Sequence, residues 1–199
     1  MAKKKRRRSP KRGLLFVVSA PSGCGKTTIC KRLTSIFPRL TNSISVTTRL
    51  PRDNEKDGRD YCFVSRDRFL KMRKRGAFLE WAGNFGYFYG TPRGPVEKTL
   101  RKGRDMLLAI DVKGAGKVKK KIPESIHIFL KPPSISDLRA RLKKRGTDNL
   151  SQMRRRLKIA SREIARAKRY DYIVVNDSLN KAVKRVKSIL QSEKKKHSR

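Results

Sequence analysis

A short apolar run followed by a turn of small residues, within residues 14–28, constrains the fold more than any other part of the chain. Residues 14–18 are uncharged and include aromatic and β-branched side chains, which predicts a short buried strand. The turn that follows is Ala20-Pro21-Ser22-Gly23-Cys24-Gly25-Lys26-Thr27-Thr28, and residues 27–37 carry apolar side chains at helical spacing. A strand, a glycine-rich turn and a helix in this order predict a cradle for phosphate.

The chemistry of this turn suits an anion. Gly23 and Gly25 have no Cβ, so backbone N–H groups can converge on phosphate oxygens, and the helix adds its positive end. Lys26 is placed to reach the β- and γ-phosphates, and the Thr27 hydroxyl to complete a Mg²⁺ shell. Ala20 replaces the first glycine of the strict motif, and its Cβ is tolerable only if φ is negative there and no phosphate oxygen presses on that side. An ordinary strand-to-helix turn is the alternative, and we favour the nucleotide site.

The chain is strongly basic. Fifty-four Lys and Arg against sixteen Asp and Glu give a net charge of +38 in 199 residues, a length that suits one domain. Such a surface attracts polyanions, so a weak, salt-sensitive association with RNA is a secondary prediction. The sequence contains no RNA- or DNA-binding motif, and a composition bias of the source explains the charge equally well.

Targeting and redox features are sparse. No apolar run of eighteen residues exists, so we expect no membrane partner and a cytoplasmic location. Residues 1–12 carry eight Lys and Arg without an apolar stretch, which excludes a secretory signal; a solvated tail is the default over a nuclear-type address or an organelle-import tract. Cys24, Cys30 and Cys62 lack metal-ligand spacing, which predicts free thiols in a reducing compartment. We interpret Cys24 as a small filler rather than a thiol activated by nearby positive charge.

Apolar strands alternate with helices along the rest of the chain. Residues 39–43 are expected to connect the first helix to a strand. Strands are predicted at residues 44–48, 77–82, 106–110, 126–130 and 171–176, and helices at 66–75, 97–102, 114–121, 134–144, 151–168 and 178–193. This order predicts a parallel sheet with helices on both faces.

Three further features carry chemistry. Arg49 and Arg52 flank Pro51 and could clamp a second anion, although in so basic a chain a structural role is about as well supported. Glu80 is either a solvated residue on an outer face or an acceptor for two N–H donors of a base edge. Asp111 ends an apolar strand, where a carboxylate orients Mg²⁺-bound water or substrate.

Together, in order and spacing, the motifs over residues 14–190 resemble guanylate kinase. The matching pieces are Pro21-Ser22-Gly23-Cys24-Gly25-Lys26, Thr47-Thr48-Arg49-Leu50-Pro51-Arg52, Gly58-Arg59-Asp60-Tyr61, Glu80-Trp81, Tyr89-Gly90-Thr91, Ile110-Asp111 with Gly114, Arg145-Gly146, Arg156-Leu157 and Val175-Asn176-Asp177.

The resemblance implies an α/β fold with a P-loop NTPase-type parallel sheet flanked by helices, an inserted GMP-binding subdomain and a mobile lid. Residues 13–199 would form a single domain after the basic tail at 1–12. Its parts would be a core at 13–44, 93–144 and 161–193, the GMP-binding insertion at 45–92, the lid at 145–160 and a second basic tail at 194–199.

The resemblance also implies ATP-dependent phosphorylation of GMP, and of dGMP, by direct in-line transfer with Mg²⁺. The implied ATP-binding residues are Pro21, Ser22, Gly23, Cys24, Gly25, Lys26, Thr27, Thr28 and Asn176, with Thr27 also on Mg²⁺ and Asn176 near adenine. The implied GMP-binding residues are Ser45, Arg49, Arg52, Tyr61, Glu80, Tyr89, Thr91 and Asp111. The implied catalytic residues are Lys26, Arg49, Asp111, Arg145 and Arg156, the last two on the lid.

The chain departs from the family pattern at Ala20, at Ala109, where an acid is usual, and at Lys113, where glutamine is usual. These changes bear on catalytic efficiency more than on substrate class. A catalytically inactive, guanylate-kinase-like interaction module is the alternative, but such modules typically lose the cradle or its lysine. The sequence makes no prediction about oligomeric state.

Overall fold

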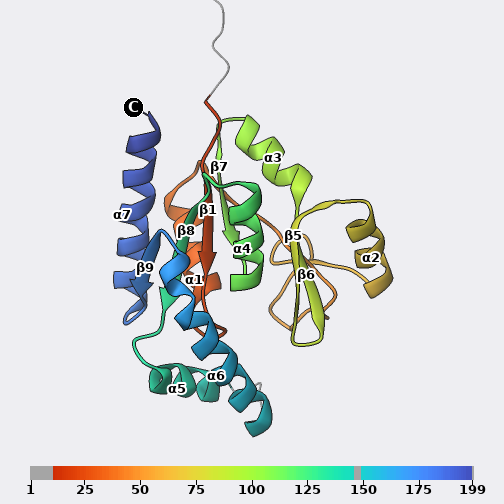
Figure 1. Ribbon diagram of the computed structural model, residues 1–199, viewed down its shortest axis with the longest axis vertical. Helices are drawn as coiled ribbons and strands as arrows, with labels where there is room; N and C mark the ends of the chain where they lie inside the picture. Colours follow the sequence, from red (N-terminus) through yellow and green to blue (C-terminus); the bar gives the residue numbers. More distant parts are fainter. Residues whose placement is uncertain (1–10, 146–148, 199) are drawn as a thin grey trace, which may run out of the picture.

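The computed structural model describes residues 11–145 and 149–198, with the side chain of Arg145 outside the described part. At its centre lies a five-stranded parallel sheet in the order β2-β7-β1-β8-β9 (Figure 1). Its strands are β1 (Leu15–Ser19), β2 (Leu40–Asn42), β7 (Asp105–Ala109), β8 (Ile126–Lys131) and β9 (Tyr172–Val175). The predicted parallel sheet is therefore confirmed.

Helices cover both faces of this sheet, and β1 shows why. Phe16 and Val18 point into one apolar cluster with α1 (Lys26–Ile36) and α7 (Leu179–Ser198), whereas Leu15 and Val17 point into another with α3 (Arg93–Arg101) and α4 (Val112–Lys121). The alternation follows from the two-residue period of a strand, so a strand buried on both faces is apolar throughout. The helices are α1 (Lys26–Ile36), α3 (Arg93–Arg101), α4 (Val112–Lys121), α5 (Ile135–Arg145), α6 (Leu150–Ala165) and α7 (Leu179–Ser198), and a short 3₁₀ helix η1 covers Ala167–Arg169.

A second, smaller sheet is inserted between β2 and α3 and lies beside the central sheet (Figure 1). It has the order β4-β3-β6-β5, from β3 (Val46–Thr47), β4 (Cys62–Phe63), β5 (Phe78–Asn84) and β6 (Tyr87–Pro92), with α2 (Arg66–Lys74) packed on it. Phe69 of α2 stacks on Phe78 and Phe88, with ring centroids 4.6 and 5.4 Å away. This insertion therefore has an aromatic core of its own.

Several predicted elements differ from the structure, and β4 and β6 were not predicted as strands. The expected connection at residues 39–43 contains β2, because Leu40 is buried and pairs in parallel with Asp105 of β7. The helix expected from residue 97 begins at Arg93, since Pro95 is tolerated in a first helical turn. The last helix continues past residue 193 to Ser198, through most of the expected basic tail, and Lys194 there forms an ion pair with Asp105 at 2.7 Å.

In the part of the chain that the structure describes, none of the helices combines the length and apolar character needed to cross a lipid bilayer.

Candidate active site

The predicted phosphate cradle lies between β1 and α1. Gly23 and Gly25 have φ values of 90° and 76°, a left-handed backbone that favours glycine, and Gly25 is the N-cap of α1. Ala20 is buried in the apolar core and has no positive φ. The backbone condition for an alanine at that position is therefore met.

Asn176 braces the cradle from the end of β9. Its Nδ2 donates to the carbonyl oxygen of Cys24 at 2.8 Å, and a Cβ on Gly25 would lie only 2.9 Å from that nitrogen. Nη2 of Arg141 donates in turn to the Asn176 carbonyl at 2.8 Å. Asn176 thus shapes the loop, and its contact with adenine stays a prediction.

Cys24 belongs to the same loop, and its side chain is fully buried. Burial raises the pKa of its thiol to about 12, and the opposing effect of Arg141 is smaller. Because a protonated, buried thiol is unreactive, the structure supports the filler interpretation rather than an activated thiol.

Lys26 links the cradle to the neighbouring strand. Its Nζ donates to the carbonyl oxygen of Ile110, just after β7, at 2.9 Å. Burial lowers the pKa of Lys26, and the most effective group acting against that shift is Asp111. Thr27 and Thr28 are exposed in the first turn of α1. The predicted lysine, carboxylate and hydroxyl are thus held at the same edge of the sheet.

Asp111 is the N-cap of α4, and its Oδ1 accepts a hydrogen bond from the backbone N–H of Gly114 at 2.7 Å. Gly114 is also where Glu80 approaches the helix, because a Cβ there would lie 2.5 Å from Oε2 of Glu80. Two carboxylates that are thirty-one positions apart in the sequence therefore meet at the first turn of one helix.

Glu80 and Thr91 face each other on adjacent strands. They pair in register between β5 and β6, and the Thr91 hydroxyl donates to Oε1 of Glu80 at 2.7 Å. Both are buried, with Glu80 only 4% exposed, which contradicts an outer-face, solvated Glu80. Burial raises the pKa of Glu80 to about 7, although the hydrogen bond from Thr91 opposes this.

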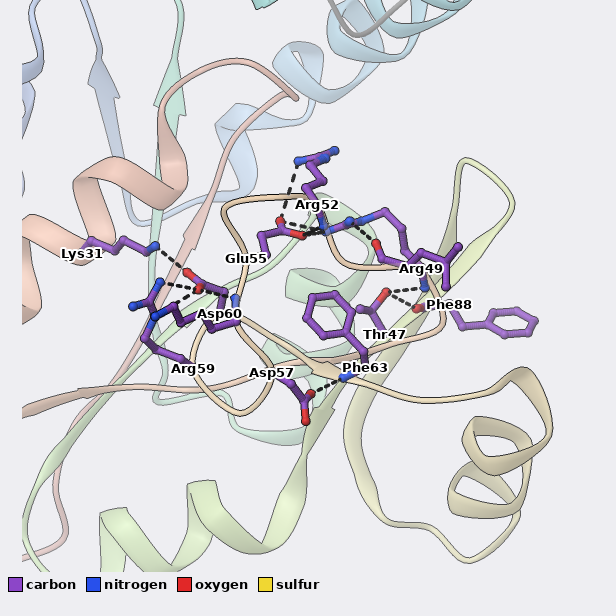
Figure 2. Close-up of polar contacts among 12 residues, drawn as sticks. Lys31, Thr47, Arg49, Arg52, Glu55, Asp57, Arg59, Asp60, Phe63 and Phe88 are labelled. Atoms are coloured by element: carbon purple, nitrogen blue, oxygen red, sulfur yellow. Dashed lines mark hydrogen bonds and ion pairs between the residues drawn. The ribbon is translucent and has the colours of Figure 1, made fainter.

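The two predicted clamp arginines meet at an acid that the sequence interpretation missed. Nη2 of Arg49 donates to both carboxylate oxygens of Glu55 at 2.7 and 2.9 Å, and the backbone N–H of Arg52 donates to Oε2 at 3.0 Å (Figure 2). The Arg52 guanidinium lies 3.8 Å from Oε1. The sequence did contain a signal for Glu55, because an acid three positions after Arg52 has the spacing that closes a turn.

Aromatic rings complete this cluster. The Arg49 guanidinium lies 5.5 Å from the ring centroid of Tyr61, whose ring is 6.2 Å from that of Tyr89. Burial raises the pKa of Tyr61, so its hydroxyl stays protonated and able to donate. Ser45, just before β3, is partly buried and its carbonyl accepts from Cys62 at 2.9 Å. The structure thus gathers Arg49, Arg52, Tyr61 and Tyr89, and their binding of a phosphate stays a prediction.

A second acid, Asp60, anchors the same loop to α1. Oδ1 of Asp60 accepts from Nζ of Lys31 on α1 at 2.5 Å, while Arg59 and the backbone N–H of Lys56 bind Oδ2 (Figure 2). These contacts hold the pKa of Asp60 well below its usual range, chiefly through Lys31. The loop before Tyr61 is thereby tied to the helix that begins at the cradle.

The predicted lid arginine Arg156 reaches the cradle from α6. Its Nη1 donates to Oγ of Ser22 at 2.7 Å, and its guanidinium lies 4.6 Å from the ring centroid of Phe85 at the β5–β6 turn. Phe85 has a φ of 50°, a conformation uncommon for an aromatic residue. The prediction for Arg145 concerns a side chain outside the described part.

Glu163 of α6 is a further acid near this centre. Burial raises its pKa to about 7, with Asp111 adding to the shift and Lys26 and Lys113 opposing it. Lys113 is exposed, and Ala109 packs against the main apolar cluster. The only sequence signal for Glu163 was one acid in an arginine-rich helix, which is a weak signal by itself.

Oxygen ligands for a metal are few. Among the described side chains no three or more His, Cys, Asp and Glu residues gather into a metal-binding group. The exposed hydroxyl of Thr27 beside the cradle is an oxygen donor of the kind that Mg²⁺ accepts, with the remaining ligands supplied by phosphates and water. This donor set fits an ion carried by a nucleotide.

Comparisons with known proteins place these features in context. The family model described as guanylate kinase matches residues 12–193. A guanylate kinase of Caldanaerobacter subterraneus subsp. tengcongensis is 47% identical over 184 residues, 92% of this chain and 89% of that protein. A guanylate kinase of Thiobacillus denitrificans is 48% identical, over 90% of this chain and 86% of that protein. The crystal structure of guanylate kinase from Anaplasma phagocytophilum superposes with a TM-score of 0.76 at 35% identity, covering 92% of this chain and 87% of that one.

Proposed function

The chain belongs to the guanylate kinase family of ATP-dependent GMP kinases, and we propose that it transfers the γ-phosphoryl group of Mg²⁺-bound ATP directly to the phosphate of GMP or dGMP. The observation that carries this proposal is the buried Glu80–Thr91 pair beside the first turn of α4, on the edge that also holds Lys26.

The base would be selected at Glu80. Guanine presents N1–H and an exocyclic amine, two donors that an ionised carboxylate can accept, whereas adenine presents a lone pair at N1. The Thr91 hydroxyl already fixes one oxygen of Glu80 at 2.7 Å, so the carboxylate is oriented before substrate arrives. Ser45 and Thr91 would supply further polar contacts to the base. Since dGMP carries the same base and phosphate, the same side chains would bind it.

The acceptor phosphate would bind among Arg49, Arg52, Tyr61 and Tyr89. Two guanidinium groups and two phenol hydroxyls offer the donors that a phosphate dianion requires. In the structure the Glu55 carboxylate occupies donors of both arginines. Phosphate binding would therefore share or displace these contacts.

The donor phosphates would lie in the cradle, held by backbone N–H groups and by Lys26. Transfer of a phosphoryl group asks the protein mainly for positioning and for positive charge on the equatorial oxygens. Lys26 supplies charge from the cradle, and Arg145 and Arg156 would supply it from the lid. Asp111 would orient the acceptor phosphate between the two substrates.

Mg²⁺ bound to ATP would neutralise phosphate charge during transfer, with the Thr27 hydroxyl as its protein ligand. The side chains of Lys26 and Arg156 would hold the phosphates in line and, when α6 covers the cradle, exclude water.

The test is formation of nucleoside diphosphate from ATP, in the presence of Mg²⁺, with GMP, dGMP, AMP, CMP and UMP in parallel. We expect turnover with GMP and dGMP only, and loss of most turnover in Arg49→Ala. A folded chain that binds GMP without turning it over would reverse the proposal and favour the interaction module. That module lacks support from the site, which retains Lys26, Thr27 and the clamp arginines.

The association with RNA stays a secondary prediction, supported by the net charge of +38. The exposed Lys and Arg of the described residues are spread over all seven α-helices, α1 to α7, rather than gathered on one face. We therefore expect only weak binding that falls steeply as salt is added, and salt-independent binding would contradict this.

A further inference from the structure

Two lysines of α4 hold the strand that carries Glu80. Nζ of Lys117 donates to the carbonyl oxygen of Trp81 at 2.5 Å, and Nζ of Lys121, one turn further along, donates to that of Leu79 at 2.5 Å. These carbonyls belong to the residues on either side of Glu80 in β5. The helix therefore grips the strand backbone immediately before and after the base-reading carboxylate.

Lys117 makes a second contact that Lys121 does not share among the described interactions. Its ammonium lies 4.5 Å from the ring centroid of Trp81, and the guanidinium of Arg73 on α2 lies 4.8 Å from the same centroid. Trp81 thus receives one cation from a helix of the central sheet and one from the insertion. Lys117 is the member of this pair that comes from outside the insertion.

The helix α4 positions both Asp111 and the strand that carries Glu80. Asp111 caps α4, Gly114 gives Oε2 of Glu80 room to approach, and Lys117 holds the next residue of the strand. Their spacing of three residues puts all three on one side of α4. A shift of β5 along α4 would therefore move Glu80 relative to Asp111.

We propose that Lys117 is a positioning residue for guanine recognition, which sets β5 against α4 and so places the Glu80 carboxylate beside Asp111. The inference rests on the proposed function in one respect, namely that Glu80 reads the base. It assigns no contact with substrate to Lys117 itself.

The charges around Glu80 give this role a distinctive signature. Thr91 faces Glu80 from β6, Asp111 and Lys117 from α4, and Lys26 from α1. Burial raises the pKa of Glu80 most, Asp111 raises it further, and Thr91, Lys117 and Lys26 lower it. Removing the Lys117 charge should therefore leave Glu80 protonated up to a higher pH. Lys121 is not among the principal groups acting on this pKa.

The experiment compares Lys117→Met, Lys117→Arg and Lys121→Met in the full chain. Methionine keeps the aliphatic stem over Trp81 and loses the donor and the charge. For Lys117→Met we expect KM for GMP to rise about three- to tenfold with kcat within twofold, since a charge-assisted hydrogen bond is lost at an exposed site. We also expect the acidic limb of kcat/KM for GMP to move up by roughly half a pH unit.

Lys117→Arg should restore KM for GMP and the acidic limb of kcat/KM to their wild-type values. Lys121→Met should leave the acidic limb of kcat/KM where it is in wild type. An unchanged KM and pH profile in Lys117→Met would overturn the proposal, as would equal effects of the two methionine variants with an unmoved limb. The proposed function is tested separately by wild-type turnover of GMP. If wild type binds GMP without turnover, calorimetric GMP affinities of the same variants across pH decide the role of Lys117.

Discussion

Glu55 accepts two hydrogen bonds from a single nitrogen of Arg49, at 2.7 and 2.9 Å, and both side chains are largely buried, with 16% and 13% exposed. The carboxylate occupies part of the proposed phosphate clamp. It thus neutralises an arginine that would otherwise lie among aromatic rings without a counter-ion.

We predict that Glu55→Gln lowers the free energy of unfolding by about 1–3 kcal/mol, because an arginine that is mostly buried loses its ionic partner. Inorganic phosphate should then raise the Tm of the variant more than that of wild type, since the dianion replaces the lost charge. Urea unfolding and thermal scans with and without phosphate measure both effects.

Glu124→Gln is the matched control, because Glu124 pairs with Arg12 at an exposed site and should change stability by less than about 0.5 kcal/mol. Equal phosphate effects in Glu55→Gln and wild type would contradict the prediction.

Glu80 makes the stability of the protein depend on pH. The pKa of Glu80 is about 7 in the fold against an ordinary value of 4.5, so the folded state binds the proton more tightly than the unfolded state. Its contribution to stability is therefore full below pH 4.5 and is lost as pH rises towards 7. Glu80→Gln removes this effect. We predict that the free energy of unfolding of the variant matches that of wild type near pH 4.5 and exceeds it by up to about 3 kcal/mol at pH 8. Urea unfolding at the two pH values measures the difference, and a constant difference would refute the assignment.

The same carboxylate should control the choice of base. Glutamine offers one donor and one acceptor, so Glu80→Gln should lower kcat/KM for GMP and raise that for AMP, because the amide can donate to N1 of adenine. In wild type, kcat/KM for GMP should fall as pH drops below about 7, since the neutral acid cannot accept both guanine donors. Initial rates with GMP and AMP between pH 5.5 and 8.5 test this. An unaltered GMP-to-AMP ratio would assign base selection elsewhere.

Lys26 should matter for turnover and little for folding. Because burial lowers the pKa of Lys26, its charge is disfavoured in the fold and Lys26→Met should not be destabilising. We predict a loss of at least about a hundredfold in kcat, as for removal of one group that stabilises transition-state charge. Lys98→Met on α3 changes an exposed lysine and should leave kcat as it is. Steady-state rates with matched thermal unfolding check the prediction, and near-normal kcat in Lys26→Met would remove it from the mechanism.

The contact of Phe85 with Arg156 should couple the insertion to α6. Arg156→Met should lower kcat about a hundredfold through lost charge on the phosphoryl group. Phe85→Leu should lower kcat about three- to tenfold, the range of a cation–π contact, and should have no further effect in the Arg156→Met background. Phe85→Trp keeps the aromatic face and serves as the control. Additive losses in the double variant would mean that the two residues act independently.

The cradle and most of the strands and helices around it were predictable from the sequence alone. Those features depend on local chemistry: glycine at positive φ in Gly23 and Gly25, a period of two in β1, and helical spacing in α1. The spacing of whole motifs also predicted, through the family resemblance, which charged residues would carry chemistry.

Which side chains meet is a consequence of tertiary packing. The approach of Glu80 to Gly114 and the contact of Lys117 with β5 join residues brought together by folding, and no local pattern encodes such contacts. The pairing of Glu55 with Arg49 within one loop had a local signal, the spacing of Glu55 from Arg52, but its burial follows from packing. The same holds for β2, whose three residues become a strand because β7 provides hydrogen-bond partners. Burial, too, is a property of the assembled chain, which is why the raised pKa values of Cys24 and Glu80 follow from packing rather than from neighbouring residues.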